Sequence, residues 1–219
     1  MKSVLDFLSQ LNQHNNREWF QQNKAWYEEV KTELERYVDR EIIAPLARND
    51  SHLANINAKK CLFRIYRDVR FSKNKLPYKT AMGFFIGRDG RKSPAGYYLH
   101  IEPSNSFVGG GAYRPEAAIL KAIRNEIYFD AGAFKKIVSQ PDFVHLFGEL
   151  RGERLKRAPK GFPADFQDVE WLKLKDFTVL HAFSDQAVCS EDFGRQAVHV
   201  FHQMKPLNDF IYRAISNME

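Results

Sequence analysis

Cysteine is scarce in this chain, which has only Cys61 and Cys189 among 219 residues and no CxxC motif, so we expect reduced, mainly structural thiols. No apolar run approaches the ~20 residues that a membrane span needs. The opening MKSVLDFLSQL mixes polar residues into its apolar ones, unlike the apolar core of a secretory signal. We therefore expect a cytoplasmic protein that has no membrane partner.

Common catalytic and nucleotide-binding motifs are also missing. The chain contains no GxGxxG, GxxxxGK[ST], GxSxG or HExxH pattern. The sequence therefore names no reaction, predicts no metal site and leaves the cofactor unknown.

The composition is that of an ordinary globular protein, with 44% apolar and 27% charged residues. A chain of this length buries roughly 70% of its unfolded surface as one domain. Eighteen Phe and nine Tyr give such a core its bulk. We expect a single domain over residues 1–219, of unknown oligomeric state.

Positive charge is concentrated in two short segments. The net charge is +6 for the whole chain, but +7 for residues 59–79 and +4 for residues 151–160, which leaves −5 for the remainder. Like charges so gathered repel one another unless an anion or a carboxylate lies between them. The charge pattern therefore indicates a local site on a mildly acidic body.

The periodicity of apolar residues predicts an α+β fold. A spacing of three, four and seven predicts a long helix over 16–47, with Asn15 or Asn16 as its N-cap. Alternating patterns and turn residues predict an antiparallel sheet with strands over 62–71, 80–87, 96–102 and 106–111. Helical patterns fill most of the rest, over 115–127, 133–139, 142–149, 165–174, 190–204 and 206–216.

The strongest candidate site is the basic strand and loop RIYRDVRFSKNKLPYK, residues 64–79. Guanidinium groups bind phosphates and carboxylates bidentately, and lysines add mobile charges. The candidate anion ligands are Arg64, Arg67, Arg70, Lys73, Lys75 and Lys79, with Tyr78 to orient the ligand and Asp68 as a candidate catalytic group. Alternatively, the arginines pair with acids elsewhere and only hold the sheet to the helices.

A second candidate lies in the strand YLHIE, where Tyr98, His100 and Glu102 point to one face. His100 and Glu102 could act as an acid/base pair, or as two ligands of a metal whose third ligand is Asp68, His181 or His199. The exposed face of a solvated strand would carry the same pattern. His199 and His202, three apart on a helix, are expected to be surface or core residues.

Two glycine- or proline-containing loops are weaker candidates. Gly110 and Gly111, just before the helix start at Arg114-Pro115-Glu116, could bring backbone amides to an anion that Arg114 also binds, but the pattern favours a tight turn or bulge. The basic segment 155–162 could extend the basic surface or form an ordinary loop.

Several blocks together resemble a widespread bacterial and fungal family of conserved hypothetical proteins, known as a domain of unknown function. They are NNREWFQQNKAWYEE (15–29), LFRIYRDVRFSKNKLPYKT (62–80), PAGYYLHIEP (94–103), GGGAYRPE (109–116) and APKGF (158–162), and the likeness runs from about residue 3 to residue 216. The resemblance implies that the basic loop, the YYxHxE strand and the glycine run are the family's signature. It implies no activity, and this chain has Asn74 where the family usually has Asp.

The sequence thus favours a pocket that binds a small anionic ligand, phosphorylated or carboxylated, and that catalyses its turnover if His100 and Glu102 act on it. The basic residues should then converge in a concave site lined by aromatic side chains. The alternatives are a nucleic-acid-binding module, a non-catalytic adaptor for an acidic protein partner, and, remotely, a metal-dependent oxygenase that uses His100 and Glu102.

Overall fold

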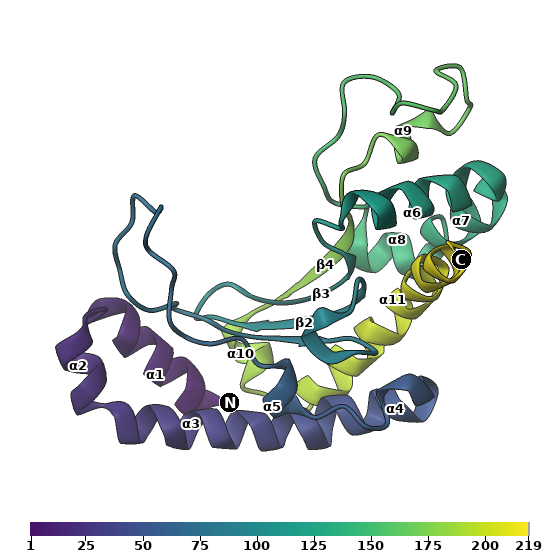
Figure 1. Cartoon of the computed structure of the whole chain (residues 1–219). Helices are drawn as coiled ribbons and strands as arrows, with labels where there is room; N and C mark the ends of the chain where they lie inside the picture. The colour runs from purple at the N-terminus through teal and green to yellow at the C-terminus, as the bar shows by residue number, and fades with distance from the viewer. Residues whose placement is uncertain (219) are drawn as a thin grey trace. The chain divides into compact units, whose positions relative to one another are not determined.

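The computed structural model describes residues 1–218 and confirms the α+β class (Figure 1). Within these residues four strands form one antiparallel sheet in the order β1-β2-β3-β4. The strands are β1 (Met82–Ile86), β2 (Gly96–Ile101), β3 (Ser106–Ala112) and β4 (Phe177–Phe183). The helices are α1 (Lys2–Gln13), α2 (Arg17–Gln22), α3 (Lys24–Tyr37), α4 (Ala44–Asn49), α5 (Ala58–Cys61), α6 (Ala117–Phe129), α7 (Ala131–Val138), α8 (Pro141–Phe147), α9 (Val169–Leu172), α10 (Asp185–Val188) and α11 (Phe193–Ser216). In the described part of the chain, no helix is both long and apolar enough to cross a lipid bilayer.

The chain forms two compact units. The first unit contains residues 1–91, 98–108 and 182–199, and the second contains residues 92–97, 109–181 and 200–218. The division between the units passes through β2, β3 and β4. The organisation as a single domain stays a prediction.

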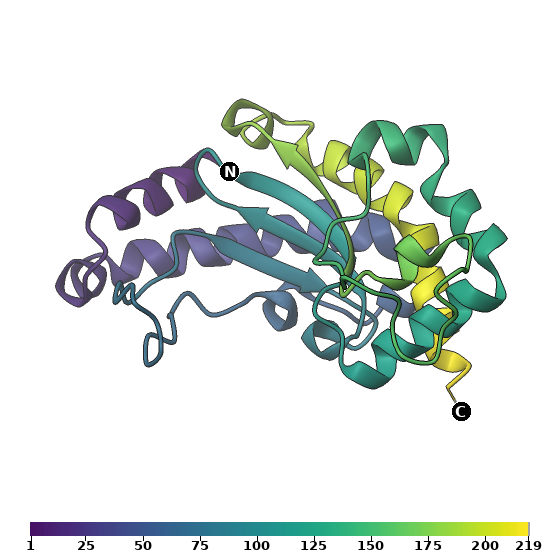
Figure 2. The ribbon, with the colours of Figure 1, turned by 90° about the horizontal axis from the view of Figure 1, so that it is seen from above.

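The core of the first unit is built on amphipathic helices. In α1 the buried side chains include Val4, Leu8 and Leu11, which recur at the helical spacing that brings them to one face. Figures 1 and 2 show α1 and α3 running along one side of the strands of this unit. The N-cap predicted at Asn16 is confirmed, because its side-chain oxygen accepts a hydrogen bond from Trp19 N at 2.9 Å.

Two helix predictions are wrong in their boundaries. The helix predicted over 16–47 is divided into α2, α3, the π-helix Val38–Ile43 (η1) and α4, with a break at Asn23. The separate helices predicted before and after Pro206 are one helix, α11. Proline inside a helix costs about 3 kcal/mol, and the buried apolar face that α11 carries on both sides of Pro206 outweighs that cost.

The strand predicted over 62–71 is not formed. The segment makes only isolated antiparallel bridges, Leu62 with Phe84 and Tyr66 with Tyr78. Beyond Tyr66 the chain leaves the sheet as a loop, because Pro77 on the returning segment has no N–H to donate and the charged side chains between them remain in water. We call residues 66–76 the arm, and Figure 1 shows it rising on the opposite side of the strands from α3.

Three of the four strands of the sheet were predicted and one was not. Those over 80–87, 96–102 and 106–111 are confirmed as β1, β2 and β3 to within two residues. The Asp-Gly turn after β1 is also confirmed, with Gly90 at φ +60°. β4 was not predicted, and only four residues of the helix predicted over 165–174 are helical, as α9.

Candidate functional site

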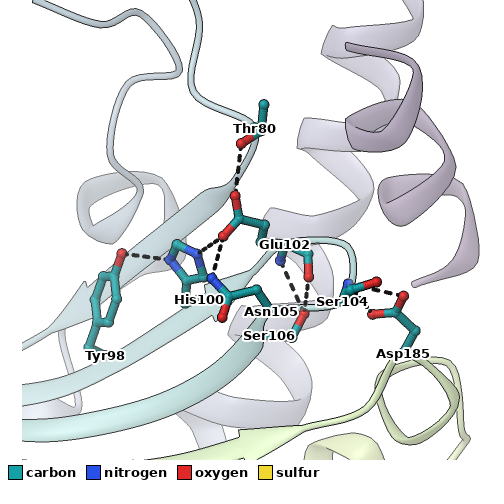
Figure 3. Close-up of polar contacts among 8 residues, drawn as sticks. All are labelled: Thr80, Tyr98, His100, Glu102, Ser104, Asn105, Ser106 and Asp185. Carbon is teal, nitrogen blue, oxygen red and sulfur yellow. Dashed lines mark hydrogen bonds and ion pairs between the residues drawn. The ribbon is translucent and has the colours of Figure 1, made fainter. Parts of the chain in front are cut away.

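The alternation of side chains in β2 places Tyr98, His100 and Glu102 on one face, partly open to solvent (Figure 3). The residues between them, Leu99 and Ile101, are fully buried on the opposite face. The strand therefore has an apolar side that anchors it in the core and a polar side that is available for chemistry.

A chain of hydrogen bonds runs along this polar face. Tyr98 Oη lies 3.1 Å from His100 Nδ1, and His100 Nε2 lies 3.1 Å from Glu102 Oε2. Two further donors reach the carboxylate, Thr80 Oγ1 to Oε1 at 2.8 Å and Asn105 Nδ2 to Oε2 at 2.7 Å (Figure 3). The glutamate is therefore held by three side chains.

These contacts assign the protons of the chain. Burial raises the pKa of the Glu102 carboxyl, but the hydrogen bonds from Asn105 and the two other donors outweigh it, so the net pKa is lowered. An ionised carboxylate only accepts hydrogen bonds, so the proton shared with it must sit on His100 Nε2. Nδ1 is then free to accept the Tyr98 hydroxyl proton, while Glu102 would stabilise the resulting imidazolium. We call Tyr98, His100 and Glu102 the relay.

Packing around the relay fixes its geometry. The His100 ring stacks on Phe107, with centroids 4.6 Å apart and an interplanar angle of 18°. A Cβ on Gly83 of β1 would lie 2.4 Å from Tyr98 Oη, so only glycine leaves room for the hydroxyl there.

The turn between β2 and β3 is also held by side chains. Ser106 Oγ donates to the main-chain oxygen of Glu102 at 2.9 Å. Ser104 adopts φ +60°, and its N–H donates to Asp185 Oδ1 at 2.8 Å (Figure 3). The turn therefore carries Asn105 to the relay in a defined position.

Two cations lie beside the relay over the ring of Phe63, and the charge of a third, Arg64, acts on one of them. Lys79 Nζ and Arg91 Cζ each lie 5.6 Å from the ring centroid, and the Tyr98 ring lies 6.2 Å from it. Burial lowers the pKa of Lys79, and the charges of Arg64 and Arg91 lower it further. We call Arg64, Lys79 and Arg91 the cation cluster.

No member of the cation cluster makes an ion pair with a carboxylate among residues 1–218. The charge of Arg64 does act on Asp68, since it helps to lower the pKa of that carboxyl. Arg91 was missed in the sequence, although its place directly after the Asp-Gly turn between two predicted strands was a signal for it.

The arm carries five of the predicted site residues, which are Arg67, Asp68, Arg70, Lys73 and Lys75. Asp68 is exposed, and Arg70 binds it at 2.7 Å, which is the main cause of its lowered pKa. The Asn74 side-chain oxygen accepts from Leu76 N at 2.9 Å and closes a turn that an aspartate would close equally well. Lys73 is exposed on the same loop. Asp68 thus meets Arg70 and makes no contact with His100 among the residues that the structure describes.

Two other cations of the arm hold its shape. Arg67 donates from Nη1 to the main-chain oxygen of Leu76 at 3.1 Å, and its Nη2 lies 3.5 Å from Ser72 Oγ. Lys75 Nζ donates to the main-chain oxygen of Val69 at 3.0 Å. Neither contact is to a carboxylate, so both cations lack a counter-charge within these contacts.

Tyr78 anchors the base of the arm. Its side chain is 3% exposed and stacks on Phe20, with centroids 4.0 Å apart. Its main chain is bound by Asn15, which donates to Tyr78 O at 3.0 Å and accepts from Tyr78 N at 3.1 Å. A ring so buried supports the arm and is not placed to orient a ligand.

The glycine run belongs to the second unit and has a packing role. Gly110 and Gly111 lie inside β3, and the Gly111 N–H already donates to Asn208 Oδ1 at 3.1 Å. A Cβ on Gly111, at φ +101°, would lie 1.9 Å from Phe177 O. Arg114 follows in the same unit, with its guanidinium over a neighbouring tyrosine ring.

No group of three His, Cys, Asp or Glu side chains able to hold a metal occurs within residues 1–218. His181, in the second unit, lies with Nδ1 3.1 Å from Leu146 O, and His199 is exposed on α11.

Neither of two cavities in the structure is lined by a residue of the relay. One, of about 670 Å³, is lined by residues of α1, α3 and η1, including Glu29 and Arg40. The other, of about 630 Å³, lies in the second unit and includes Arg154 and Trp171. The relay instead lies on a partly open face of the sheet.

The comparisons with known proteins give a family and no activity. No curated protein and no solved structure matches the chain. One family model matches residues 3–210, which is nearly the whole sequence. The chain therefore belongs to the family of conserved hypothetical proteins DUF2461.

Proposed function

We propose that the cation cluster and the relay form a site for a small phosphorylated or carboxylated ligand in the cytoplasm, and that the relay performs acid/base catalysis on that ligand. The observation that carries this proposal is the position of Lys79, which is partly buried, shares the Phe63 ring with Arg91 and is acted on by the charges of Arg64 and Arg91. A partly buried lysine near two exposed arginines and without an ion-paired carboxylate destabilises the fold, and a bound anion would supply the missing counter-charge.

The relay defines which atom would act on the ligand. Both imidazole nitrogens of His100 are occupied, by Tyr98 and by Glu102, so the phenol oxygen is the outer end of the chain. As Tyr98 passes its proton to His100 Nδ1, its oxygen can take a proton from the ligand. The reverse transfer returns that proton and makes Tyr98 the general acid.

A thermal-shift experiment with inorganic phosphate, citrate and phosphorylated metabolites tests the binding step. A ligand at 100 times its dissociation constant adds about 2.7 kcal/mol, or roughly 5–11 °C in Tm for a protein of this size. Arg91→Ala should abolish the shift. Arg48→Ala, which removes another exposed arginine of the first unit, should leave it intact. Equal shifts in the two variants, or no shift with any anion, would refute the site.

A second variant separates catalysis from binding. Tyr98→Phe keeps the ring against Phe63 and removes only the hydroxyl that faces His100. Once a stabilising ligand is found, this variant should bind it normally and fail to turn it over. Unchanged turnover would remove the relay from the mechanism.

A further inference from the structure

The arm presents an aromatic side chain to solvent almost completely. Phe71 is 96% exposed, and Tyr66 at the start of the arm is 48% exposed. The Arg70 guanidinium lies 5.9 Å from the Phe71 ring centroid, so the aromatic group and a positive charge are presented together.

The arm is a loop whose conformation is held by hydrogen bonds and an ion pair. The ion pair of Arg70 with Asp68 and the bond from Lys75 to Val69 O hold its outer part. At its base, Arg67 N donates to Pro77 O at 2.9 Å. A surface ordered before binding loses less conformational entropy when a partner arrives.

The charge of the arm selects the kind of partner. Four cations against Asp68 give residues 66–76 a net charge of +3, and the cations are Arg67, Arg70, Lys73 and Lys75. We propose that the arm binds single-stranded nucleic acid, with bases stacking on Phe71 and Tyr66 and with phosphates beside the four cations.

The distribution of aromatic side chains favours a nucleic acid strand over a membrane surface. Tyr66 and Phe71 are both exposed by more than a third, and each is next in sequence to an arginine. A loop that inserts into a bilayer gathers its apolar groups at one depth, whereas these rings are spread from the base of the arm to its middle. Stacking also needs an open base face, which a duplex does not offer.

This inference rests on the arm and is independent of the cation cluster. Loss of small-anion binding in Arg91→Ala would leave it standing, and failure of the arm to bind a strand would leave the proposed small-ligand site standing.

Fluorescence anisotropy with a labelled oligothymidylate about 12 nucleotides long tests the proposal. Phe71→Ala should weaken binding by about 5- to 150-fold, which corresponds to the 1–3 kcal/mol of one stacked base. The matched control is Phe129→Ala, which removes an 82% exposed phenylalanine of the second unit and should change nothing. Contact with about four phosphates should weaken binding roughly 50-fold between 50 and 200 mM salt.

Three outcomes would overturn the proposal. One is the absence of oligothymidylate binding by the full chain at 50 mM salt, and another is equal affinity of Phe71→Ala and Phe129→Ala. The third is cosedimentation with phosphatidylserine vesicles that Phe71→Ala abolishes, in a protein that does not bind the oligonucleotide, since that would assign the arm to a membrane surface. Circular dichroism of each variant checks that its fold is intact.

Discussion

Replacing Glu102 by glutamine tests whether the relay is ordered as described. The carboxylate accepts from Thr80, Asn105 and His100. Glutamine keeps one oxygen, which Thr80 can still reach, but its amide group turns donors toward the Asn105 amide and the His100 Nε2–H. Hydrogen bonds to a charged group are worth about 1.5–3 kcal/mol each, and water replaces part of that at a partly open site. We therefore expect a loss of about 2–3 kcal/mol, or roughly 4–12 °C in Tm.

The pH dependence of this loss identifies its source. Because the folded-state pKa of Glu102 is lowered, its contribution to stability is present above the unfolded-state pKa of about 4.3 and disappears as the pH falls through the folded value. Urea unfolding of the wild type and of Glu102→Gln should thus show the widest gap at neutral pH and a narrower one at pH 3. Glu33→Gln, at an exposed position of α3, is the control and should match the wild type. A gap that is the same at both pH values, or no gap at all, would show that the ionised carboxylate does not organise the relay.

Three further substitutions, the first with a matched control, test the other assignments. Gly111→Ala and Gly161→Ala both force alanine to a positive φ, +101° and +93°, at a cost of about 1–2 kcal/mol. Only Gly111 is crowded, so its variant should lose about 1–3 kcal/mol more in urea unfolding. Asn74→Asp should leave Tm unchanged, since the turn to Leu76 is kept, and should weaken oligothymidylate binding roughly threefold at low salt by anisotropy. Lys79→Met should raise the anion-free stability by up to about 1 kcal/mol, because it removes a desolvated charge near two arginines, and should abolish the thermal shift by phosphate.

The first three strands were predictable because their signals are local. The alternating apolar residues of β1 and β2 and the Asp-Gly turn between them lie close together in the sequence. Alternation alone, however, does not show whether a partner strand exists. It led to the wrong prediction of a strand over 62–71, where the segment that folds back alongside begins with Pro77, which lacks an N–H to pair. β4 pairs with β3 across more than 60 residues of intervening chain, and no local pattern reports such a pairing.

The relay was half predictable for a similar reason. The period of a strand is enough to place Tyr98, His100 and Glu102 on one face. This period does not place Thr80, which precedes β1, or Asn105, which lies in the turn after β2, although both donate to the Glu102 carboxylate. Those donors determine that the glutamate is ionised, and hence the direction of the proton chain.

Counting charges located the basic segment, but it could not show that some of its cations belong to the arm and others to the cation cluster. Arg70 forms an exposed ion pair with Asp68, whereas Lys79, nine residues later, is partly buried without an ion pair. The difference arises from the path of the chain, which turns Arg70 outward on the arm and returns Lys79 to the sheet. The sequence therefore predicted one anion site where the structure separates a cation cluster from a charged arm.

This separation has a measurable consequence in salt. The cations of the arm are solvated, so their attraction to phosphates is screened within a Debye length of about 8 Å at physiological ionic strength. Lys79 lies partly out of water against Phe63, where salt screens its interactions much less. Phosphate binding at the cation cluster, measured by thermal shift, should therefore persist at a potassium chloride concentration that releases an oligonucleotide from the arm. If both ligands were lost in parallel as salt rises, the two surfaces would be one solvated patch of charge, and the desolvation of Lys79 would have no part in recognition.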